Sequence, residues 1–366
     1  MQSVRVFDDN FVFITEIDDY ESLLWTRKWH KPGSFELHMN LNKLYADRLK
    51  KDYILMVGDS AGRILYRELK QGEKGKGDEE VVVRGTTYSA VVGSRITIPP
   101  TGYAYDRVNS NIETIMKSYV TRNCVSPVDV KRVIPNLIVA ADEGRGEKIV
   151  YQSRYKQLDE ELEKLSVLSG LGWDIRFDWD IGQWVFDVFE GKVLTVNQSE
   201  SSPVVFSIDF DNIKEQSFIE SSVGHKNMAY VGGQGEGVER TVIEVGNEFE
   251  GLGRLEMFVD ARDIEDSGDL PNRGMQKLLE VSPIKTFETE ILDGDPFRYK
   301  VDWDLGDVVT IRNRKWGITV DSRITEVTEI YDETGFKLKV VFGNKVPTLI
   351  DRIKYELDKP LVEKHV

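Results

Sequence analysis

The chain has few of the side chains from which catalytic and metal sites are usually built. It contains one cysteine, Cys124, so neither an intrachain disulfide nor a multi-cysteine zinc cluster can form. Its four histidines, His30, His38, His225 and His365, lack the spacing of metal ligands. The low cysteine content fits folding in a reducing cytoplasm. These absences give no support for a metal or thiol site.

Long apolar runs and an excess of positive charge are also missing. No apolar stretch approaches the ~20 residues that a membrane-spanning helix needs, and residues 1–9 hold no signal-peptide core. We therefore expect no stable membrane insertion and no export by the usual route. The 366 residues include 63 acidic and 48 basic side chains, a net charge of −15. Because phosphate binding needs clustered lysine and arginine, nucleic acid is not expected as the main partner.

The chain is long, and its strand patterns are strong. It exceeds the about 250–300 residues at which single cores stop growing, so we expect two or more modules. Near the C-terminus, Leu305-Gly-Asp leads into alternating segments, a reversal at Asp332-Glu-Thr-Gly335 and a closing strand at 336–343. This pattern predicts antiparallel strands that fill one small β-barrel.

The N-terminal region is also predicted to be mostly antiparallel β. Period-two alternation predicts strands at 4–7, 11–17, 22–25, 34–39, 53–57, 63–69 and 80–84. A short helix is predicted at 40–50, with Leu41, Leu44 and Tyr45 on one side. Residues 71–79 are polar and glycine-rich, which is typical of a mobile hairpin tip.

A helical pattern replaces the alternation between about 109 and 196. Residues 111–120 and 155–168 carry apolar side chains at helical spacing, and Gly170 follows the second helix. Residues 173–177 and 183–189 are then predicted to form a hairpin. The whole stretch indicates an α/β insertion.

Strands resume after residue 203. The patterns predict strands at 204–208, 229–231, 240–245 and 287–291, a helix at 275–280 and a C-terminal helix at about 347–357. We expect the strands at 229–231 and 240–245 to be neighbours joined by a glycine-rich loop.

Two glycine motifs resemble catalytic or phosphate-binding loops. Gly58-Asp-Ser-Ala-Gly62 matches the nucleophile elbow of serine hydrolases, which needs a helix after it. A strand pattern follows instead, so a hairpin turn is favoured over catalysis by Ser60. Gly233-x-Gly235-x-Gly237 resembles half of a phosphate-binding loop, but a strand also follows it. A hairpin loop is the favoured interpretation there as well.

Acidic residues suggest two further sites. A calcium loop could start at Asp263, but Gly274 stands where a bidentate glutamate is needed, so a solvated acidic linker at 260–269 is favoured. The pairs Asp178/Asp180 and Asp302/Asp304 could serve a glycosidase, which needs two carboxylates about 5–10 Å apart. Acids that flank tryptophans in turns are more often turn and surface residues.

The tryptophans lie in or beside predicted strands. This position suits barrel cores or subunit contacts, and a sugar-stacking platform is the alternative. The seven are Trp25, Trp29, Trp173, Trp179, Trp184, Trp303 and Trp316.

The order of several motifs resembles the tail-hub proteins of siphophages and prophages. The motifs are Leu24-Trp-Thr-Arg-Lys-Trp-His-Lys-Pro-Gly-Ser-Phe-Glu-Leu37, Gly85-Thr-Thr-Tyr-Ser-Ala-Val-Val-Gly-Ser-Arg-Ile-Thr-Ile98, Asn227-Met-Ala-Tyr-Val-Gly-Gly-Gln-Gly-Glu-Gly-Val-Glu-Arg240, Phe258-Val-Asp-Ala-Arg-Asp263 and Leu305-Gly-Asp-Val-Val309. Together they span nearly the whole chain. The chain is thus similar to baseplate hubs and to the N-terminal structural module of tail-associated lysins.

The resemblance implies an α+β, mainly β fold with two small antiparallel β-barrels, an α/β insertion and a subsidiary region. The first barrel would comprise 1–105 plus 199–240, and the insertion 106–198. The second barrel would comprise 241–250 plus 300–346, with 251–299 as the subsidiary region and 347–366 as a C-terminal helix and tail.

The same resemblance implies a noncatalytic hub that adapts a hexameric tail tube to a trimeric tip and closes or gates the tail channel. Its expected partners are further copies of itself in a homotrimer, a distal tail protein or tail tube above, and a tip, fibre or lysin protein below. Its expected location is the virion tail tip, after assembly in the bacterial host cytoplasm. Catalytic, cofactor-binding and metal-binding residues are not expected.

Two other functions stay open. Tail-associated lysins continue into a peptidase or muramidase domain, whereas this chain ends at Val366, so wall-degrading activity is expected in another subunit. A cell-wall hydrolase using Ser60 or the paired acids is one alternative. A tryptophan-rich carbohydrate-binding module is the other.

Overall fold

The computed structural model describes residues 2–72, 79–246, 248–292 and 296–343. The described residues divide into two compact units: unit 1 lies within 2–216 and 288–342, and unit 2 lies within 217–287 and includes Gly343. Strands account for 45% of the structure and helices for 19%, which confirms the α+β, mainly β class. The predicted hairpin tip at 73–78 and the predicted helix at 347–357 lie outside the described residues.

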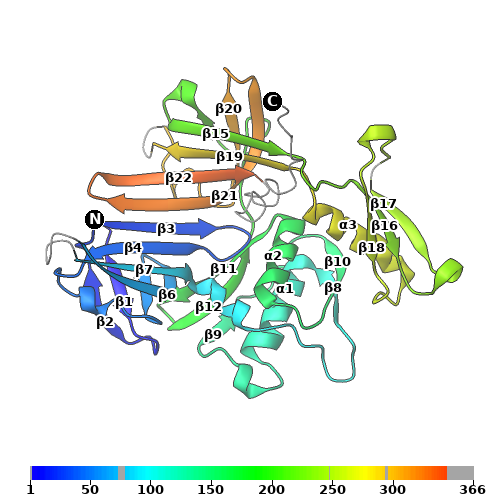
Figure 1. Ribbon diagram of the computed structural model, residues 1–366, viewed down its shortest axis with the longest axis horizontal. Coiled ribbons are helices and arrows are strands. Elements are labelled where there is room, and N and C mark those ends of the chain that lie inside the picture. The colour runs from blue at the N-terminus through cyan, green and yellow to red at the C-terminus, as the bar shows by residue number, and fades with distance from the viewer. Residues whose placement is uncertain (1, 73–78, 247, 293–295, 344–366) are drawn as a thin grey trace, which may run out of the picture. The chain divides into compact units, whose positions relative to one another are not determined.

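The N-terminal strands of unit 1 form an antiparallel array. In space their order is β3-β4-β7-β6-β5-β1-β2, and β2 lies at the edge of the sheet (Figure 1). One face buries a core that includes Trp25, Phe35, Leu37 and Leu55. The strands are β1 (Val4–Phe7), β2 (Phe13–Ile17), β3 (Ser22–Lys28), β4 (Ser34–Asn40), β5 (Ile54–Val57), β6 (Ser60–Gln71) and β7 (Glu79–Thr87).

The predicted helix at 40–50 is wrong. The segment forms turns and one short 3₁₀ helix, Ala46–Arg48. Tyr45 has a left-handed φ of 67°, which an α-helix does not tolerate. The Asn40 side chain accepts a hydrogen bond from the backbone N–H of Asn42 at 2.9 Å, a local bond that competes with helix formation.

The C-terminal strands come from separated parts of the chain, and their residues 217–221 and 284–287 belong to unit 2. β20 pairs antiparallel with the first half of β21 and parallel with β13 and β14. The second half of β21 pairs with β22 across the predicted turn at 332–335. The strands are β13 (Val193–Leu194), β14 (Val205–Ser207), β15 (Ile213–Ser221), β19 (Ile284–Ile291), β20 (Val308–Asn313), β21 (Ile318–Asp332) and β22 (Gly335–Gly343).

β21 also joins the two arrays into one sheet of fourteen described strands. Its second half pairs antiparallel with β3, with Thr328 opposite Thr26. The main order runs from β15 at one end to β2 at the other, and no closed barrel is found in the described ranges. β21 pairs with strands of both arrays, so the alternating pattern in the sequence gives no boundary between the two arrays. Two closed barrels therefore stay a prediction.

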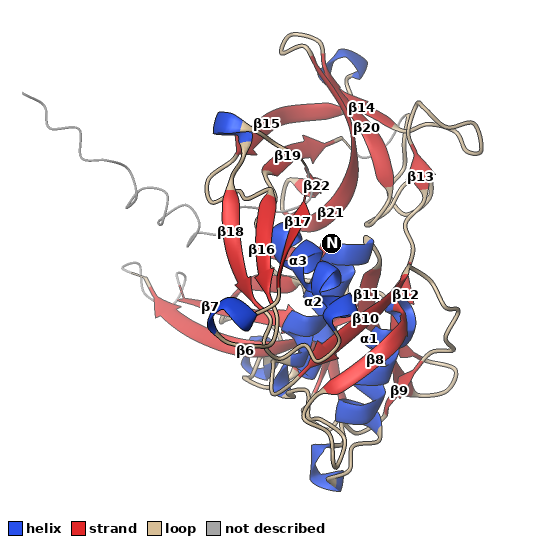
Figure 2. Cartoon of the chain, turned by 90° about the vertical axis from the view of Figure 1, so that its right-hand side faces the viewer, coloured by secondary structure: helices blue, strands red, loops and turns tan. Residues whose placement is uncertain are grey.

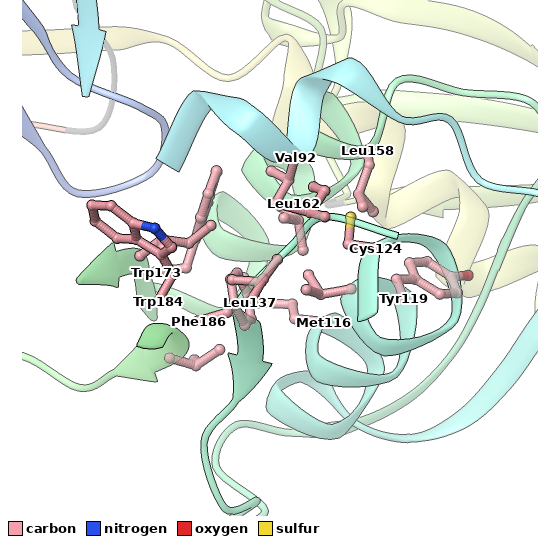
Figure 3. Packing of buried hydrophobic residues seen from close by; sticks show 14 of the residues in the cluster. Val92, Met116, Tyr119, Cys124, Leu137, Leu158, Leu162, Trp173, Trp184 and Phe186 are labelled. Atoms are coloured by element: carbon pink, nitrogen blue, oxygen red, sulfur yellow. The ribbon is translucent and has the colours of Figure 1, made fainter. Parts of the chain in front are cut away.

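The main elements predicted for the segment 109–196 are confirmed. The helices at 111–120 and 155–168 and the hairpin at 173–189 are confirmed, and Gly170 ends α2 with a φ of 75°. Figure 3 shows Met116, Leu162 and Phe186 converging in its core. The elements are β8 (Asp106–Asn111), α1 (Ile112–Val120), β9 (Leu137–Val139), β10 (Lys148–Ser153), α2 (Leu158–Ser169), β11 (Gly172–Asp178) and β12 (Gln183–Phe189).

The insertion core continues onto the N-terminal array. Phe7 of β1 and Met56 of β5 belong to the same buried cluster as the side chains of α1 and α2. The strands β1 and β5 are therefore covered on both faces, which explains their nearly uniform apolar character.

Unit 2 contains a three-stranded sheet with one helix. β16 (Met228–Gly232) lies between β17 (Val242–Gly246) and β18 (Glu256–Asp260), as Figure 2 shows, and α3 (Leu270–Glu280) packs on β16 and β17. The predicted pairing of 229–231 with 240–245 is confirmed. The helix predicted at 275–280 is also confirmed, and it begins one turn earlier.

The strand pairings differ from the predicted module composition at two places. β14 was expected with the N-terminal strands but pairs with β20. β16 and β17 were assigned to different barrels but pair with each other. Alternation reveals that a strand exists but not which strand lies beside it. The module limits themselves stay a prediction.

Candidate functional site

Ser60 lies in a hairpin turn and not in a nucleophile elbow. It opens β6 opposite Val57 of β5, so a strand follows it as predicted. Its Oγ accepts a hydrogen bond from the indole Nε1 of Trp25 at 3.1 Å. In the described part of the chain, no hydrogen bond joins Ser60 to a histidine. The arrangement orients a core tryptophan and offers no general base of the kind a serine nucleophile needs.

The glycine loop of unit 2 is a hairpin loop. Gly233 donates its N–H to the carbonyl of Thr241, and Arg240 donates to the carbonyls of Gly232 and Gly233. A short 3₁₀ helix at 237–239 leads into β17. Because no α-helix starts here, the geometry lacks the helix terminus that binds phosphate in such loops.

The residues that could start and end a calcium loop make contacts of a different kind. Asp263 forms a 2.9 Å ion pair with Arg273, and Gly274 lies where a Cβ would approach Val231 and Val245 to 2.8 Å. Gly274 therefore allows α3 to pack closely on the sheet. Across the described ranges, no group of three or more His, Cys, Asp or Glu side chains is arranged to hold a metal ion.

The paired acids serve turns and ion pairs. Asp178 accepts hydrogen bonds from the N–H groups of Asp180 and Ile181 in the β11–β12 turn. The backbone N–H of Arg298 lowers the pKa of Asp302, which is the opposite of what a general acid requires. Asp304 pairs with Arg27 at 2.9 Å.

The histidines and the cysteine are dispersed. His30 Nδ1 bonds Ser166 Oγ at 2.7 Å, and burial lowers the pKa of His30 to about 3. His38 lies on β4, where burial lowers its pKa but hydrogen bonds to two glutamates outweigh this and leave the pKa above its ordinary value. His225 bonds the carbonyl of Val281. Burial raises the pKa of Cys124 to about 12, so this thiol stays protonated at neutral pH.

His365 lies outside the described residues. In the part of the chain that the structure describes, no helix has the length and apolar character needed to cross a membrane.

Five of the seven tryptophans are buried. Trp25, Trp29, Trp173, Trp184 and Trp303 have at most 6% of their surface exposed. Trp179 and Trp316 are about half exposed and lie in two different hairpin turns. The buried rings fill cores, so they present no stacking platform at the surface.

A partly buried polar network joins the two strand arrays. Arg27 on β3 donates to Tyr299 Oη and to Asp304, each at 2.9 Å. Tyr299 in turn donates to Glu329 on β21, which also pairs with Lys300 at 2.8 Å. The sequence suggests only that Asp304 could be one acid of a catalytic pair. Its ion-pair partner Arg27 lies 277 residues away and could not be identified from the local pattern.

A cavity of about 270 Å³ lies beside this network. Arg27, Lys300 and Asp304 line it together with Trp29, Trp173 and Trp303. The lining carries both signs of charge, and Arg27, Lys28, Arg176 and Lys300 are each within ion-pair distance of a carboxylate. The cavity therefore marks the junction between the arrays and the insertion.

The two edge strands of the fourteen-stranded sheet differ from each other. β2 ends one side, where Val12 and Phe13 are more than half exposed. β15 ends the other side of the main order and carries Lys214 and Glu215 on its exposed positions. Free strand edges can pair with another chain, so edges of this kind are candidate assembly surfaces.

Solved structures with the same fold include tail proteins. The prophage MuSo2 43 kDa tail protein from Shewanella oneidensis has a TM-score of 0.60 and 12% identity, and the match covers 93% of this chain and 98% of that one. Prophage tail protein gp18 from Listeria monocytogenes has a TM-score of 0.57 and 12% identity, with 98% of each chain covered.

A third match is longer than this chain. A chain of the lidded Francisella PdpA-VgrG complex has a TM-score of 0.52 and 9% identity, with 94% of this chain and 54% of that one covered. Among curated proteins, the search found no match.

At identities of 9–12% these likenesses establish the fold, and they agree with the resemblance to tail hubs that the motif order indicated. The family described as Siphovirus ReqiPepy6 Gp37-like protein matches residues 3–344, which is most of the chain. The protein thus belongs to the Siphovirus ReqiPepy6 Gp37-like family.

Proposed function

We propose that this protein is a noncatalytic structural hub of a phage or prophage tail tip. The observation that carries the proposal is its likeness, over nearly the whole of both chains, to two prophage tail proteins. The family match over residues 3–344 points in the same direction. In this function the chain acts through its assembly surfaces.

The assembly is a homotrimeric ring. Each subunit contributes two strand arrays, so three subunits place six arrays around the axis and match a hexameric tail tube. The unlike edges β2 and β15 support contacts between different surfaces of neighbouring copies. Such head-to-tail contacts close into a ring when the rotation between copies is a third of a turn.

The ring connects the tail tube or distal tail protein above to a tip, fibre or lysin protein below, and it closes or gates the tail channel. It forms in the host cytoplasm and functions at the virion tail tip. The placement of Ser60 and of the paired acids in turns and ion pairs supports a function without catalysis.

Genetic complementation tests this proposal. A phage that lacks the gene is supplied with the wild-type chain or with the variant Ser60→Ala/Asp180→Asn/Asp302→Asn. We expect no complete tails without the chain, and equal numbers of infective particles with either version. Complete tails that form without the chain would contradict the structural role. Complete but noninfective tails with the variant would favour the hydrolase alternative.

A further inference from the structure

Two neighbouring turns of unit 1 form an apolar surface with an acidic rim, called here the acidic tip. It comprises residues 8–13, which connect β1 and start β2, and residues 178–182, which connect β11 and β12. Its apolar side chains are each about half exposed: Val12 56%, Phe13 54%, Trp179 50% and Ile181 55%. Exposed aromatic side chains that lie together are typical of protein interfaces.

The acidic tip is held in place by the core. The Phe7 ring lies 5.6 Å from Phe13 and 6.3 Å from Trp179, and it stacks on Phe11 at 4.5 Å. The Arg5 guanidinium covers Trp179 at 5.5 Å. Since these contacts already fix the exposed rings, little conformational entropy is lost when a partner binds them.

Four carboxylates and one cation surround these rings. Asp8 and Asp178 accept hydrogen bonds from backbone N–H groups of their own turns, and Asp9 and Asp180 are exposed. Arg5 is the accompanying cation. The tip therefore combines exposed apolar side chains with a net negative charge.

A second surface of unit 1 has the opposite charge and is called here the basic surface. It comprises residues 95–98, 128–133 and 154–156. It carries five basic side chains against one acidic: Arg95, Lys131, Arg132, Arg154 and Lys156 against Asp129. Its exposed apolar side chains are Ile96 37%, Ile98 38%, Val128 93%, Val130 77%, Val133 38% and Tyr155 56%.

Hydrogen bonds join the three segments of the basic surface. Arg95 Nε donates to the carbonyl of Arg132 at 2.7 Å, and Arg132 donates to the carbonyl of Ile96 at 2.6 Å. The N–H of Tyr155 donates to the carbonyl of Thr97 at 2.7 Å. The segments therefore form one continuous surface.

Tyr155 is held in an unfavourable conformation on this surface. Its φ is 50°, a left-handed value that is rare for an aromatic residue, and Arg154 covers its ring at 5.2 Å. Because the Tyr155 side chain is exposed, this backbone strain is not offset by core packing. Strain of this kind is often retained where a residue takes part in binding.

We propose that the acidic tip of one copy docks on the basic surface of a second copy. A surface that combines net positive charge with exposed apolar side chains is unexpected in a chain of net charge −15, and it complements the acidic tip in charge and in apolar character. Both surfaces are exposed in the single chain, so neither is covered by the other. A contact between two unlike surfaces is head-to-tail and allows a closed ring. This inference rests on the proposed ring and identifies its contact surfaces.

Charge reversal tests the pairing. One variant is Asp9→Lys/Asp180→Lys, which keeps the turn-forming Asp8 and Asp178, and the second is Lys131→Glu/Lys156→Glu, which keeps the structural arginines. The controls Glu236→Lys/Glu239→Lys and Lys50→Glu/Lys51→Glu make the same charge changes at exposed positions elsewhere. Particle mass is measured by light scattering with the adjoining tail proteins present, and circular dichroism checks the fold.

We expect each reversal to raise the concentration needed for assembly at least tenfold, and the controls to change it less than twofold. The chain with all four reversals assembles better than the Asp9→Lys/Asp180→Lys variant, because the basic surface then has no net charge and no longer repels the altered tip. Trp179→Ala also weakens assembly without a change of charge. If the wild type forms rings and the reversals do so equally well, the docking surfaces are wrong and the hub proposal stands. If the wild type forms no ring with its partners, both proposals fail.

Discussion

The two strand arrays of unit 1 are assembled in different ways. The N-terminal array uses the continuous stretch from Val4 to Thr87, and all of its internal pairings are antiparallel. The C-terminal array collects strands from separated stretches between residues 193 and 343, and it includes the parallel pairings of β13 and β14 with β20. The first array therefore forms mainly from contacts that are close in sequence, whereas the second requires long loop closures.

The central tryptophans of the two arrays also differ, in their hydrogen bonding. Trp25 stacks on Phe35 with ring centroids 5.1 Å apart, and its indole donates to Ser60. Trp303 packs on Phe206 at 5.3 Å, but its buried Nε1 has no hydrogen-bond partner among the described residues. The buried indole of Trp25 thus has its hydrogen bond, whereas that of Trp303 is an orphan donor among the described residues.

The largest expected loss of stability comes from a substitution at Gly306, where the two arrays meet. Gly306 has a φ of 95°, and a Cβ there would lie 2.2 Å from Cζ3 of Trp29, which follows β3. We expect Gly306→Ala to cost more than about 4 kcal/mol of unfolding free energy, because both the backbone and a buried ring must move. Chemical denaturation of the full chain measures this.

Gly317→Ala is the matched control for this variant. Its φ of 68° is also left-handed, but a Cβ there meets nothing within 4 Å. The control should lose only about 1–2 kcal/mol from backbone strain. Equal losses for the two variants would show that the contact with Trp29 contributes nothing.

A smaller effect separates the two central tryptophans. Both Trp25→Phe and Trp303→Phe remove ring volume, but only the first breaks a hydrogen bond, since the indole of Trp303 has none among the described residues. We expect Trp25→Phe to be more destabilising by about 1 kcal/mol. Denaturant midpoints of the two variants provide the comparison, and a larger loss for Trp303→Phe would contradict it.

The last expected effect is a pH dependence of stability at His30, which follows β3. Burial, with Arg323 and Lys31 nearby, lowers the pKa of His30 from 6.5 to about 3. Below pH 6.5 His30 is protonated in the unfolded chain but stays neutral in the folded chain. The stability of the folded chain therefore decreases as the pH falls from 6.5 toward 3. The His30→Gln variant should show a shallower loss between pH 6 and 4, by at most about 1.4 kcal/mol per pH unit.

His38 on β4 gives the control of opposite sign. Its pKa is raised in the folded chain, so its contribution is present below 6.5 and is lost as the pH rises through the raised value. His38→Gln should therefore cost more stability at low pH than at high pH. Parallel thermal-melting curves across pH distinguish the two histidines, and the same slope change in both variants would contradict the assignment.

Local features of the fold could be predicted from sequence. Helix α2 follows from its leucine spacing and Gly170, and the β11–β12 hairpin follows from two alternating segments around a short turn. The helix expected at 40–50 failed because side-chain hydrogen bonding at Asn40 and the left-handed Tyr45 favour turns. The pairing of β14 with β20 joins segments about a hundred residues apart, and alternation carries no information about such partners.

The sequence predicts the exposed surfaces less well than the helices and strands. The turn containing Ser60 was interpreted correctly because the pattern after it is a strand. Trp179 and Trp303 both lie between aspartates, yet one is half exposed and the other is buried, so their sequence context does not distinguish them. The exposed Trp179 beside Phe13 depends on two turns that lie about 165 residues apart and meet only in the fold.

The mass and symmetry of the assembled particle test the central claim most directly. Light scattering and negative-stain imaging are carried out over a concentration series, first with the chain alone and then with the adjoining tail proteins. The hub account predicts a three-subunit ring that shows six strand arrays around its axis. A chain that stays monomeric even with those partners would contradict the account.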